Sequence, residues 1–316
     1  MIGVIASEAA EMDVYRPRHP VDLRQTTRPL GYGAADPTFR LTADGFWRGV
    51  LTPDGPATLR VQAGAGADRG AFRIESWGPG AQWARSSAPD LLGARDDWSH
   101  LDLSRNPKLA EIRRRNAGLF LTRTGLVFPA LVGAVLAQKT TGRQARDSWR
   151  YLLVRHGTAA PGPAAPAGLL VPPGAEQWAR IPSWGWHRAG VQPSQSRTAV
   201  AAALRATSLE RLAMLDPSDE KLSSGLRSVP GVGAWTVAET TQLSHGDPDA
   251  VSVGDYHLSR DVGWALVGRP VDDDGMLELL EPWRGDRQRV IRLIYAGGLR
   301  RPRRAPRLTI QDHRGN

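Results

Sequence analysis

One aspartate and one glycine-rich turn are the residues of this sequence whose types and spacing could do chemistry together. The turn is Pro-Gly-Val-Gly (230–233), within LRSVPGVGAWTVAET (226–240), and Asp255 follows Gly233 by 22 residues, in AVSVGDYHLSRDVG. Glycine allows backbone conformations that are closed to other residues, and the free amides at the start of a helix attract phosphate. A carboxylate such as Asp255 can stabilise a positively charged reaction centre or direct a water molecule. The alternative interpretation of Asp255 is a plain N-cap, a common role for an aspartate before a helix.

The residue types that the chain lacks exclude several kinds of chemistry. None of the 316 residues is cysteine, which excludes disulfides, thiolate zinc sites, cysteine nucleophiles and cysteine-bound iron–sulfur clusters. The seven histidines form no HxxxH or HExxH pair, so no helical metal site is predicted. No apolar run approaches the roughly 20 residues of a membrane helix, and the N-terminus does not resemble a signal peptide. We therefore expect a cytoplasmic protein that does not bind membranes.

Positive charge is concentrated in the C-terminal two-thirds of the chain. The protein has 41 Lys and Arg against 32 Asp and Glu, a net charge of +9. Residues 1–100 contain 11 basic and 12 acidic residues, a net −1, so the other 216 contain 30 and 20, a net +10. This asymmetry favours a polyanionic partner such as nucleic acid. A solvated surface in an arginine-rich protein is the alternative, because all but three of the basic residues are Arg.

Two kinds of sequence pattern predict an α+β protein. Residues 20–85 contain β-rich runs between turn signals, which indicates a small antiparallel sheet. From about residue 107 the periodicity becomes helical, and residues 126–138 are apolar on nearly all sides, which predicts a buried central helix. The Pro-, Ala- and Gly-rich residues 157–177 are expected to form an exposed connection or a flexible loop. We predict a β-rich domain at 1–106, an all-α core at 107–299 and a disordered basic tail at 300–316.

The turn between two predicted helices resembles the helix-hairpin-helix of DNA repair glycosylases, with the motif at about residues 221–244. In that superfamily an essential aspartate follows the hairpin at this kind of spacing, and Asp255 matches it. Residues 131–152 and 180–197 are similar to family segments that precede the hairpin, and the N-terminal strands resemble the small sheet of the alkylpurine branch. The chain thus resembles the DNA-3-methyladenine glycosylase II-like branch over roughly residues 20–295.

The resemblance assigns the chemistry to Asp255 and argues against a lyase. It implies that the Asp255 carboxylate stabilises the cation-like sugar that forms when an N-glycosidic bond breaks, or directs the attacking water. Bifunctional members carry a Schiff-base lysine two residues after the second hairpin glycine, where this chain has Trp235. Tryptophan has no amine that could form an imine, so the resemblance implies a monofunctional hydrolase rather than a member of the oxidised-guanine branch.

The resemblance also implies an electron-rich pocket for a flipped, alkylated base. Stacking and cation–π attraction would select a cationic base, at about 0.5–2 kcal/mol per contact. The expected pocket residues are Trp235, Trp186, His187, Trp283 and Glu239. Each tryptophan taken alone is more often a core residue. Glu239 departs from the family, which often has an aromatic residue there, and so leaves the range of damaged bases open.

A DNA-binding surface around the hairpin is implied in the same way. Hairpin amides are expected to bind phosphate, and Gln138 or Lys139 to lie near the wedge that fills the gap left by the flipped base. The expected DNA-binding residues are Gly231, Gly233, Val232, Arg227, Val229, Thr236, Gln138 and Lys139. By resemblance, the backbone carbonyls of Arg227, Val229 and Val232 hold a monovalent cation, Na⁺ or K⁺, and no other cofactor is implied.

Functions of different classes remain open at this point. The first is a monofunctional DNA glycosylase for bases of the 3-methyladenine and 7-methylguanine type, acting as a monomer on damaged double-stranded DNA in base excision repair. The second is a non-catalytic helix-hairpin-helix protein that only binds DNA. A glycosylase for a different lesion is a further alternative. The presence of Asp255 favours an enzyme over a binding protein.

Overall fold

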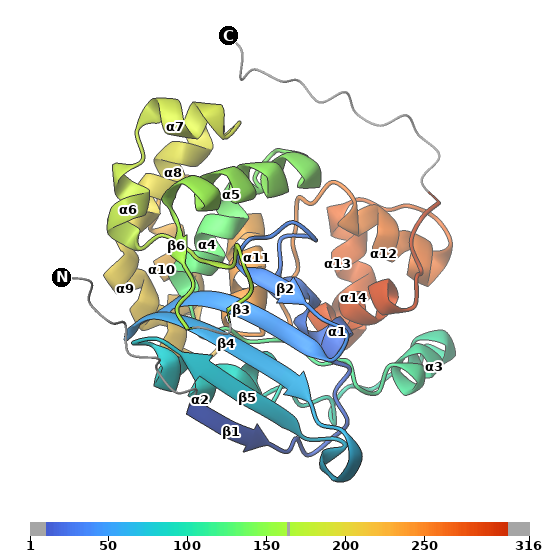
Figure 1. Cartoon of the computed structure of the whole chain (residues 1–316). Helices are drawn as coiled ribbons and strands as arrows, with labels where there is room; N and C mark the ends of the chain where they lie inside the picture. Colours follow the sequence, from blue (N-terminus) through green and yellow to red (C-terminus); the bar gives the residue numbers. More distant parts are fainter. Residues whose placement is uncertain (1–10, 163–164, 303–316) are drawn as a thin grey trace, which may run out of the picture.

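A five-stranded antiparallel sheet forms the N-terminal part of the molecule, as predicted (Figure 1). The computed structural model describes residues 11–162 and 165–302, so the predicted basic tail lies, from residue 303 on, outside the described residues. The strand order is β1-β5-β4-β3-β2. The strands are β1 (Glu11–Tyr15), β2 (Phe39–Leu41), β3 (Gly45–Thr52), β4 (Gly55–Ala63) and β5 (Phe72–Trp77). A tight turn joins the long strands β3 and β4, and its Gly55 has a φ of +122°, a value that favours glycine.

Helix α2 (Ala81–Leu91) covers one face of the sheet. Its buried residues Ala84, Ala88 and Leu91 pack against sheet residues such as Leu59 and Ile74 in one hydrophobic cluster. Short helical turns precede and interrupt the strands: α1 (Leu23–Thr27), η1 (Arg28–Leu30) and η2 (Gly66–Asp68). Because side chains alternate along each strand, the other face of the sheet needs a cover of its own.

The described residues of the Pro-rich stretch, 157–162 and 165–177, supply part of that cover, which corrects the expectation of an exposed connection. They form a two-stranded sheet from β6 (Thr158–Ala159) and β7 (Leu170–Val171). Leu169 is 4% exposed and packs against Trp47 and Trp77, whose rings stack with centroids 5.6 Å apart. The apolar run at the end of the stretch is buried because the sheet presents these two indole rings to it.

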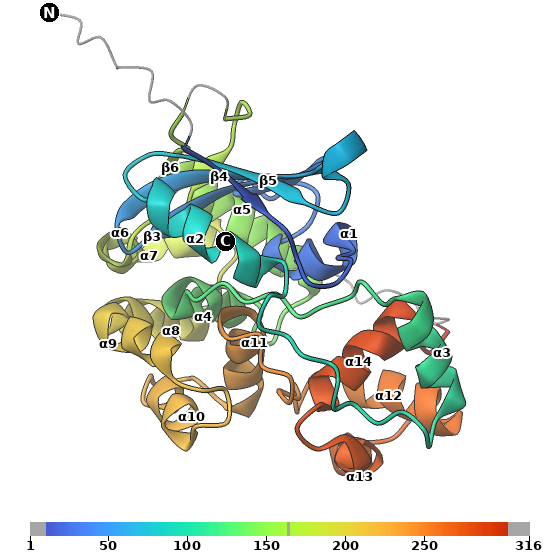
Figure 2. The same cartoon turned by 90° about the horizontal axis from the view of Figure 1, so that it is seen from below.

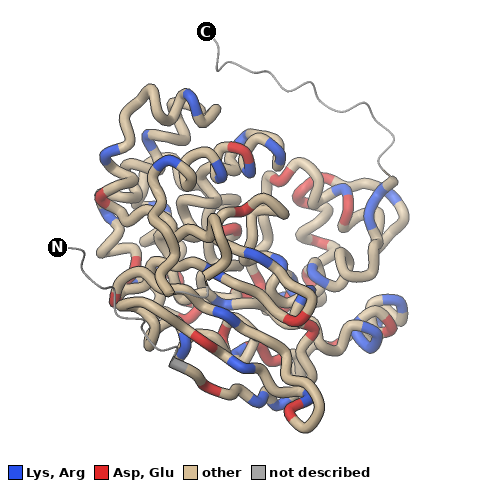
Figure 3. Tube along the Cα trace, in the orientation of Figure 1, with Lys and Arg blue, Asp and Glu red and all other residues tan. Residues whose placement is uncertain are grey.

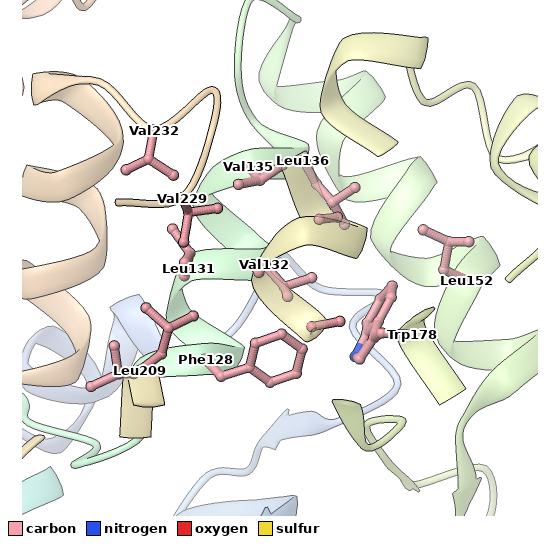
Figure 4. Packing of buried hydrophobic residues seen from close by; sticks show 14 of the residues in the cluster. Phe128, Leu131, Val132, Val135, Leu136, Leu152, Trp178, Leu209, Val229 and Val232 are labelled. Atoms are coloured by element: carbon pink, nitrogen blue, oxygen red, sulfur yellow. The ribbon is translucent and has the colours of Figure 1, made fainter. Parts of the chain in front are cut away.

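Helix α4 (Val127–Leu136) lies at the centre of a first group of helices, which confirms the predicted buried helix. Nine of its ten residues are buried, and Figure 4 shows Phe128, Leu131 and Val132 packed among side chains from several other elements. The surrounding elements are α5 (Gly142–His156), α6 (Ala175–Arg180), α7 (Ser183–Arg188), α8 (Pro193–Ala203), α9 (Ala206–Glu210), η3 (Arg211–Met214), α10 (Glu220–Arg227) and α11 (Ala234–Ser244).

A second group of helices lies beside the first and on the same side of the sheet (Figure 2). It contains α3 (Pro107–Arg115), α12 (Leu258–Val267), α13 (Asp273–Leu280), η4 (Glu281–Trp283) and α14 (Arg287–Ala296). Hydrophobic packing crosses the division predicted at residue 106, because Trp98 and Leu103 belong to the core of this second group. A buried ion pair between Asp96 and Arg289 of α14, 2.5 Å long, makes the same connection. Among the described residues, no helix is long and apolar enough to cross a membrane.

Candidate functional site

The hairpin between α10 and α11 is anchored to the helical core by two valines and one glycine. Val229 is fully buried and Val232 is 8% exposed, and both pack into the cluster around α4 (Figure 4). Gly231 has a φ of +89°, and a Cβ at this position would lie 2.1 Å from Oγ1 of Thr198 on α8. Both the backbone conformation and the close approach of α8 therefore require glycine at this position.

Gly233 has no comparable internal reason to be glycine, which corrects the expectation that both glycines adopt special conformations. Its φ of −103° and ψ of −175° describe extended backbone open to any residue. A Cβ built at Gly233 would meet no described atom within 4 Å. The missing side chain therefore leaves room outside the protein, where a ligand could approach the backbone.

Unpaired backbone amides surround Gly233. The N–H groups of Gly231, Gly233, Ala234 and Trp235 donate no hydrogen bond to any described residue. Helix α11 has no side-chain cap at this end, so its partial positive charge is also uncompensated. The hairpin can thus hold an anion such as a phosphate group.

Gln138, expected near the DNA wedge, braces the hairpin from the turn after α4. Its Nε2 donates to the carbonyl of Gly231 and to Oγ1 of Thr236, both at 2.9 Å. The next residue, Lys139, is exposed and has a φ of +48°, the one positive φ outside glycine among the described residues. Such a backbone is strained for lysine. Of the two expected wedge residues, Gln138 is thus engaged within the protein and Lys139 is free to face DNA.

The buried amide of Gln195 on α8 holds this turn in place. Its Nε2 donates to the carbonyls of Val135, Leu136 and Gln138, at 3.3, 3.1 and 2.8 Å. These contacts supply donors to carbonyls at the C-terminal end of α4 and in the turn after it, where the helix no longer provides its regular backbone partners. Gln195 therefore links the central helix to the turn that braces the hairpin.

Asp255 lies just before α12 and uses only one of its carboxylate oxygens inside the protein. Oδ1 accepts hydrogen bonds from the amides of His257 and Leu258, at 2.8 and 2.9 Å. No described residue donates to Oδ2. The N-cap position of α12 is His257, so Asp255 is not the plain N-cap of this helix. Its two hydrogen bonds, from the amides of His257 and Leu258, fix the carboxylate and leave one oxygen for a ligand. The side chain is half-buried beside the exposed residues Tyr256 and His257.

A cavity of about 240 Å³ lies where the N-terminal segment, α4, α11 and α14 meet. Its apolar surface comes largely from small residues of α4, and its polar groups come from the other elements. The lining residues are Pro29, Tyr32, Leu121, Thr122, Ala130, Gly133, Ala134, Ala137, Glu239, Gln242, Leu243, Gln288 and Arg292. Of the expected pocket residues only Glu239 is among them. Trp235, half-buried, lies one helical turn before Glu239 on the same face of α11, toward the hairpin.

The titratable groups around this cavity are desolvated. Burial raises the pKa of the Glu239 carboxyl; a hydrogen bond from Ser252 opposes this shift and the charge of Asp255 adds to it. Burial likewise raises the pKa of the Tyr32 hydroxyl, with contributions from Asp36 and Glu239. Burial lowers the pKa of Arg292 to about 10. The dependence of Glu239 on the charge of Asp255 indicates that the cavity and the catalytic candidate share one electrostatic environment.

The structure places two expected pocket tryptophans in hydrophobic cores instead of in this cavity. Trp186 is 3% exposed, stacks on Trp178 at 5.7 Å and donates its indole N–H to the carbonyl of Ile181. Trp283 is 8% exposed in the core of the second helix group and donates to the carbonyl of Asp102. Both indoles are buried with their N–H groups satisfied, so packing explains them. His187 is exposed on α7 and does not line the cavity.

Among the cavity residues that the sequence did not predict are three polar ones from segments far from the hairpin in the chain. Gln288 and Arg292 lie one turn apart on α14, and Tyr32 comes from the segment after η1. No short motif joins them to the hairpin, because only the packing of distant segments brings them together. For Gln288 and Arg292, the sequence signal was their spacing of four residues, which places both side chains on one face of a helix.

The distribution of charge does not by itself outline a site. Figure 3 shows Lys and Arg on both helix groups and on the sheet, interspersed with Asp and Glu. Among the described residues, no group of three or more His, Cys, Asp and Glu could hold a metal ion. The hairpin amides, Asp255 and the cavity remain the features with specific chemistry.

Solved structures of DNA glycosylases resemble this chain in fold. A 3-methyladenine DNA-glycosylase from Archaeoglobus fulgidus matches with a TM-score of 0.73 and 17% identity, over 90% of this chain and 98% of that one. The 8-oxoguanine glycosylase/lyase of Clostridium acetobutylicum, solved with double-stranded DNA containing cytosine opposite 8-oxoguanine, matches with a TM-score of 0.69 and 11% identity, over 92% and 97%. No family model and no curated protein matches the chain. The hairpin, the aspartate after it and the five-stranded sheet therefore belong to a chain with the fold of the helix-hairpin-helix DNA glycosylases.

Proposed function

We propose that this protein is a monofunctional DNA glycosylase, which hydrolyses the N-glycosidic bond of alkylated bases in double-stranded DNA. The observation that carries the proposal is the position of Asp255, fixed through Oδ1 with Oδ2 free. The same carboxylate raises the pKa of cavity residue Glu239. The fold shared with DNA glycosylases of two different specificities supports the reaction class.

The Asp255 carboxylate would act on the sugar. Breaking an N-glycosidic bond leaves positive charge on the ring, and a negative oxygen beside C1′ lowers the energy of that state. The two backbone amides that donate to Oδ1 hold it in a fixed position. A base made cationic by alkylation is already a good leaving group, so no strong general acid is needed.

Hydrolysis without strand cleavage is supported by Trp235. A glycosylase/lyase needs an amine that can attack C1′ and form an imine. The position two residues after Gly233 holds an indole instead, and it lies between the hairpin and the cavity. The indole face can stack on the flipped nucleotide and attract a cationic base.

DNA would be held mainly at the hairpin. The bare amides of Gly231, Gly233 and Ala234 can bind one phosphate, and exposed residues Arg227 and Lys139 can bind its neighbours. A base would then leave the stack at a cost of a few kcal/mol and enter the cavity. Such phosphate contacts predict affinity that falls steeply with salt. We also propose that the protein acts on DNA as a monomer.

The hairpin carbonyls fit the monovalent cation that the fold family implies. The carbonyls of Arg227 and Val232 accept no hydrogen bond from described residues, and that of Val229 accepts one, from the Val232 amide at 3.1 Å. Carbonyl oxygens with free lone pairs suit Na⁺ or K⁺. A cation held there would add positive charge next to the phosphate. The hairpin residues would orient the DNA and help to neutralise its phosphate charge, and they would take no part in bond breaking.

The test is incubation with methylated double-stranded DNA, with free bases measured by mass spectrometry and strand breaks measured before and after alkali. Released methylated bases, with breaks only after alkali, are the expected result. Breaks without alkali would contradict the monofunctional assignment. Salt-sensitive binding without any released base would mean that the protein only binds DNA.

A further inference from the structure

The cavity that Glu239 and Arg292 line contains hydrogen-bonding groups that the protein itself does not use. Glu239 forms no ion pair with any described residue, and among these residues it accepts one side-chain hydrogen bond, from Ser252 Oγ to Oε1, at 2.5 Å. Its Oε2 therefore has no partner among the described residues. A half-buried, desolvated carboxyl without a counter-charge is costly for the protein, which points to a ligand that supplies donors.

A short chain of hydrogen bonds fixes the position of Glu239. Gln242 lies one turn later on α11, and its Nε2 donates to Ser252 Oγ at 3.0 Å and to the carbonyl of Ala250 at 3.2 Å. Ser252 is 4% exposed, and its hydroxyl donates a hydrogen bond to Glu239. The carboxyl is thus held ready before any ligand binds, which is the arrangement expected of a recognition site.

Arg292 of α14 contributes a positively charged hydrogen-bond donor to the same cavity. Its Nη2 donates to the carbonyl of Gln25 at 2.9 Å, and no described carboxylate pairs with it. A guanidinium has five donors, so most of them remain available. Gln288, one turn earlier and 7% exposed, adds an amide to the lining.

Small residues of α4 leave a slot between these groups. A Cβ at Gly133 would lie 1.5 Å from the hydroxyl oxygen of Tyr32, so glycine lets that ring approach α4. Tyr32 also stacks on Trp149, with centroids 4.4 Å apart, which fixes its orientation. The cavity volume of about 240 Å³ equals the liquid volume of about eight water molecules, which is on the scale of a single nucleobase.

We propose that this cavity selects guanine-derived bases, with the Glu239 carboxylate accepting from N1–H and N2–H and the Arg292 guanidinium donating to O6. Guanine presents two adjacent donors on its pairing edge, which one carboxylate can accept together, and O6 is a preferred acceptor for arginine. Adenine presents a single amino donor next to an acceptor nitrogen on that edge, so it can satisfy only one carboxylate oxygen. This inference rests on the proposed glycosylase function and narrows its substrate class.

Methylated DNA tests the inference within one reaction, because it contains both 7-methylguanine and 3-methyladenine. The two bases are both cationic in DNA, so they differ mainly in their hydrogen-bonding edges. Wild type, Glu239→Gln and the control Glu278→Gln, at an exposed residue of α13, are compared by mass spectrometry of the released bases. We expect Glu239→Gln to lower 7-methylguanine release by about 10-fold to 100-fold relative to 3-methyladenine. Glu278→Gln should leave the ratio unchanged. Equal loss of both bases, or an unchanged ratio in Glu239→Gln, would overturn the inference.

Binding of free bases separates this inference from the proposed function. Free 7-methylguanine and free 3-methyladenine are titrated into wild type and Glu239→Gln by calorimetry, which needs no bond breaking. We expect wild type to bind 7-methylguanine more tightly and Glu239→Gln to lose that preference. If wild type releases no base from DNA but shows this preference, the proposed function fails and the cavity assignment stands. If it releases bases but binds both free bases equally, the cavity assignment fails alone.

Discussion

Substitution by alanine should lower the stability of the protein at one hairpin glycine and leave it almost unchanged at the other. Gly231→Ala introduces a Cβ at a φ of +89° and 2.1 Å from Thr198 Oγ1. The left-handed backbone costs about 1–2 kcal/mol, and overpacking against α8 adds about 1–3 kcal/mol. The loss should therefore be about 2–5 kcal/mol in the free energy of unfolding. At roughly 2–4 °C per kcal/mol, this lowers Tm by roughly 4–20 °C.

Gly233→Ala should leave stability almost unchanged. Its φ of −103° suits alanine, and the new Cβ meets no described atom within 4 Å. The lower entropy of the unfolded chain stabilises by about 0.4–1 kcal/mol, and alanine as an N-cap costs a few tenths more than glycine. The net change should lie within about 1 kcal/mol. The Cβ nevertheless projects into the space beside the bare amides. Loss of about 1.5–3 kcal/mol of phosphate contact would then weaken DNA binding about 10-fold to 100-fold.

The assay is thermal unfolding followed by circular dichroism, together with fluorescence anisotropy of a labelled duplex. We expect Gly233→Ala to weaken duplex binding without a loss of stability. Gly231→Ala should lower both duplex affinity and stability. If Gly233→Ala bound the duplex as tightly as wild type, the phosphate would have to lie elsewhere. If Gly233→Ala lost as much stability as Gly231→Ala, the steric argument at the hairpin would be refuted.

Three further predictions concern residues around the site. Gln195→Leu should lower the free energy of unfolding by about 1–3 kcal/mol, measured by denaturant titration, because three carbonyls lose the amide that serves them; an unchanged midpoint would count against it. Asp96→Asn should cost about 3–5 kcal/mol in the same assay, since it leaves the buried Arg289 charge with a weaker partner. The exposed Glu176→Gln should change stability by less than about 1 kcal/mol. Release of 7-methylguanine should fall as the pH is lowered through the raised pKa of Glu239, because only the ionised carboxyl accepts two donors; the same step persisting in Glu239→Gln would rule out this cause.

The hydrophobic periodicity of the sequence predicted the secondary-structure elements whose burial is set by their own residues. The apolar run at 126–138 became the buried helix α4, and the alternating strands became the sheet. The stretch at 157–177 was misjudged because its Pro and Gly content indicates a loop, whereas Leu169 finds a partner in two tryptophans from other strands. No residue near Leu169 in the sequence indicates that these two tryptophans would pack against it.

The candidate site likewise contains residues that the sequence could predict and residues that it could not. The hairpin and Asp255 lie within a short stretch of chain, and the resemblance to the glycosylase superfamily predicts the role of an aspartate at that spacing. Trp186 matched a family segment, but a match of residue type cannot tell a pocket wall from a stacked core, and the structure places it against Trp178. Tyr32 and Arg292 reach the cavity through tertiary packing alone, which no local pattern records.

Asp255→Asn tests the central claim most directly. Asparagine keeps an oxygen that can accept from His257 and Leu258, so the start of α12 and the fold should be preserved. The negative charge next to the reacting sugar is lost, which should slow base release by about 100-fold or more. The measurement is the rate of release of methylated bases from double-stranded DNA, with duplex affinity measured in parallel. We predict that the variant binds the duplex like wild type and releases almost no base. Release at the wild-type rate would contradict the assignment of Asp255 as the catalytic residue.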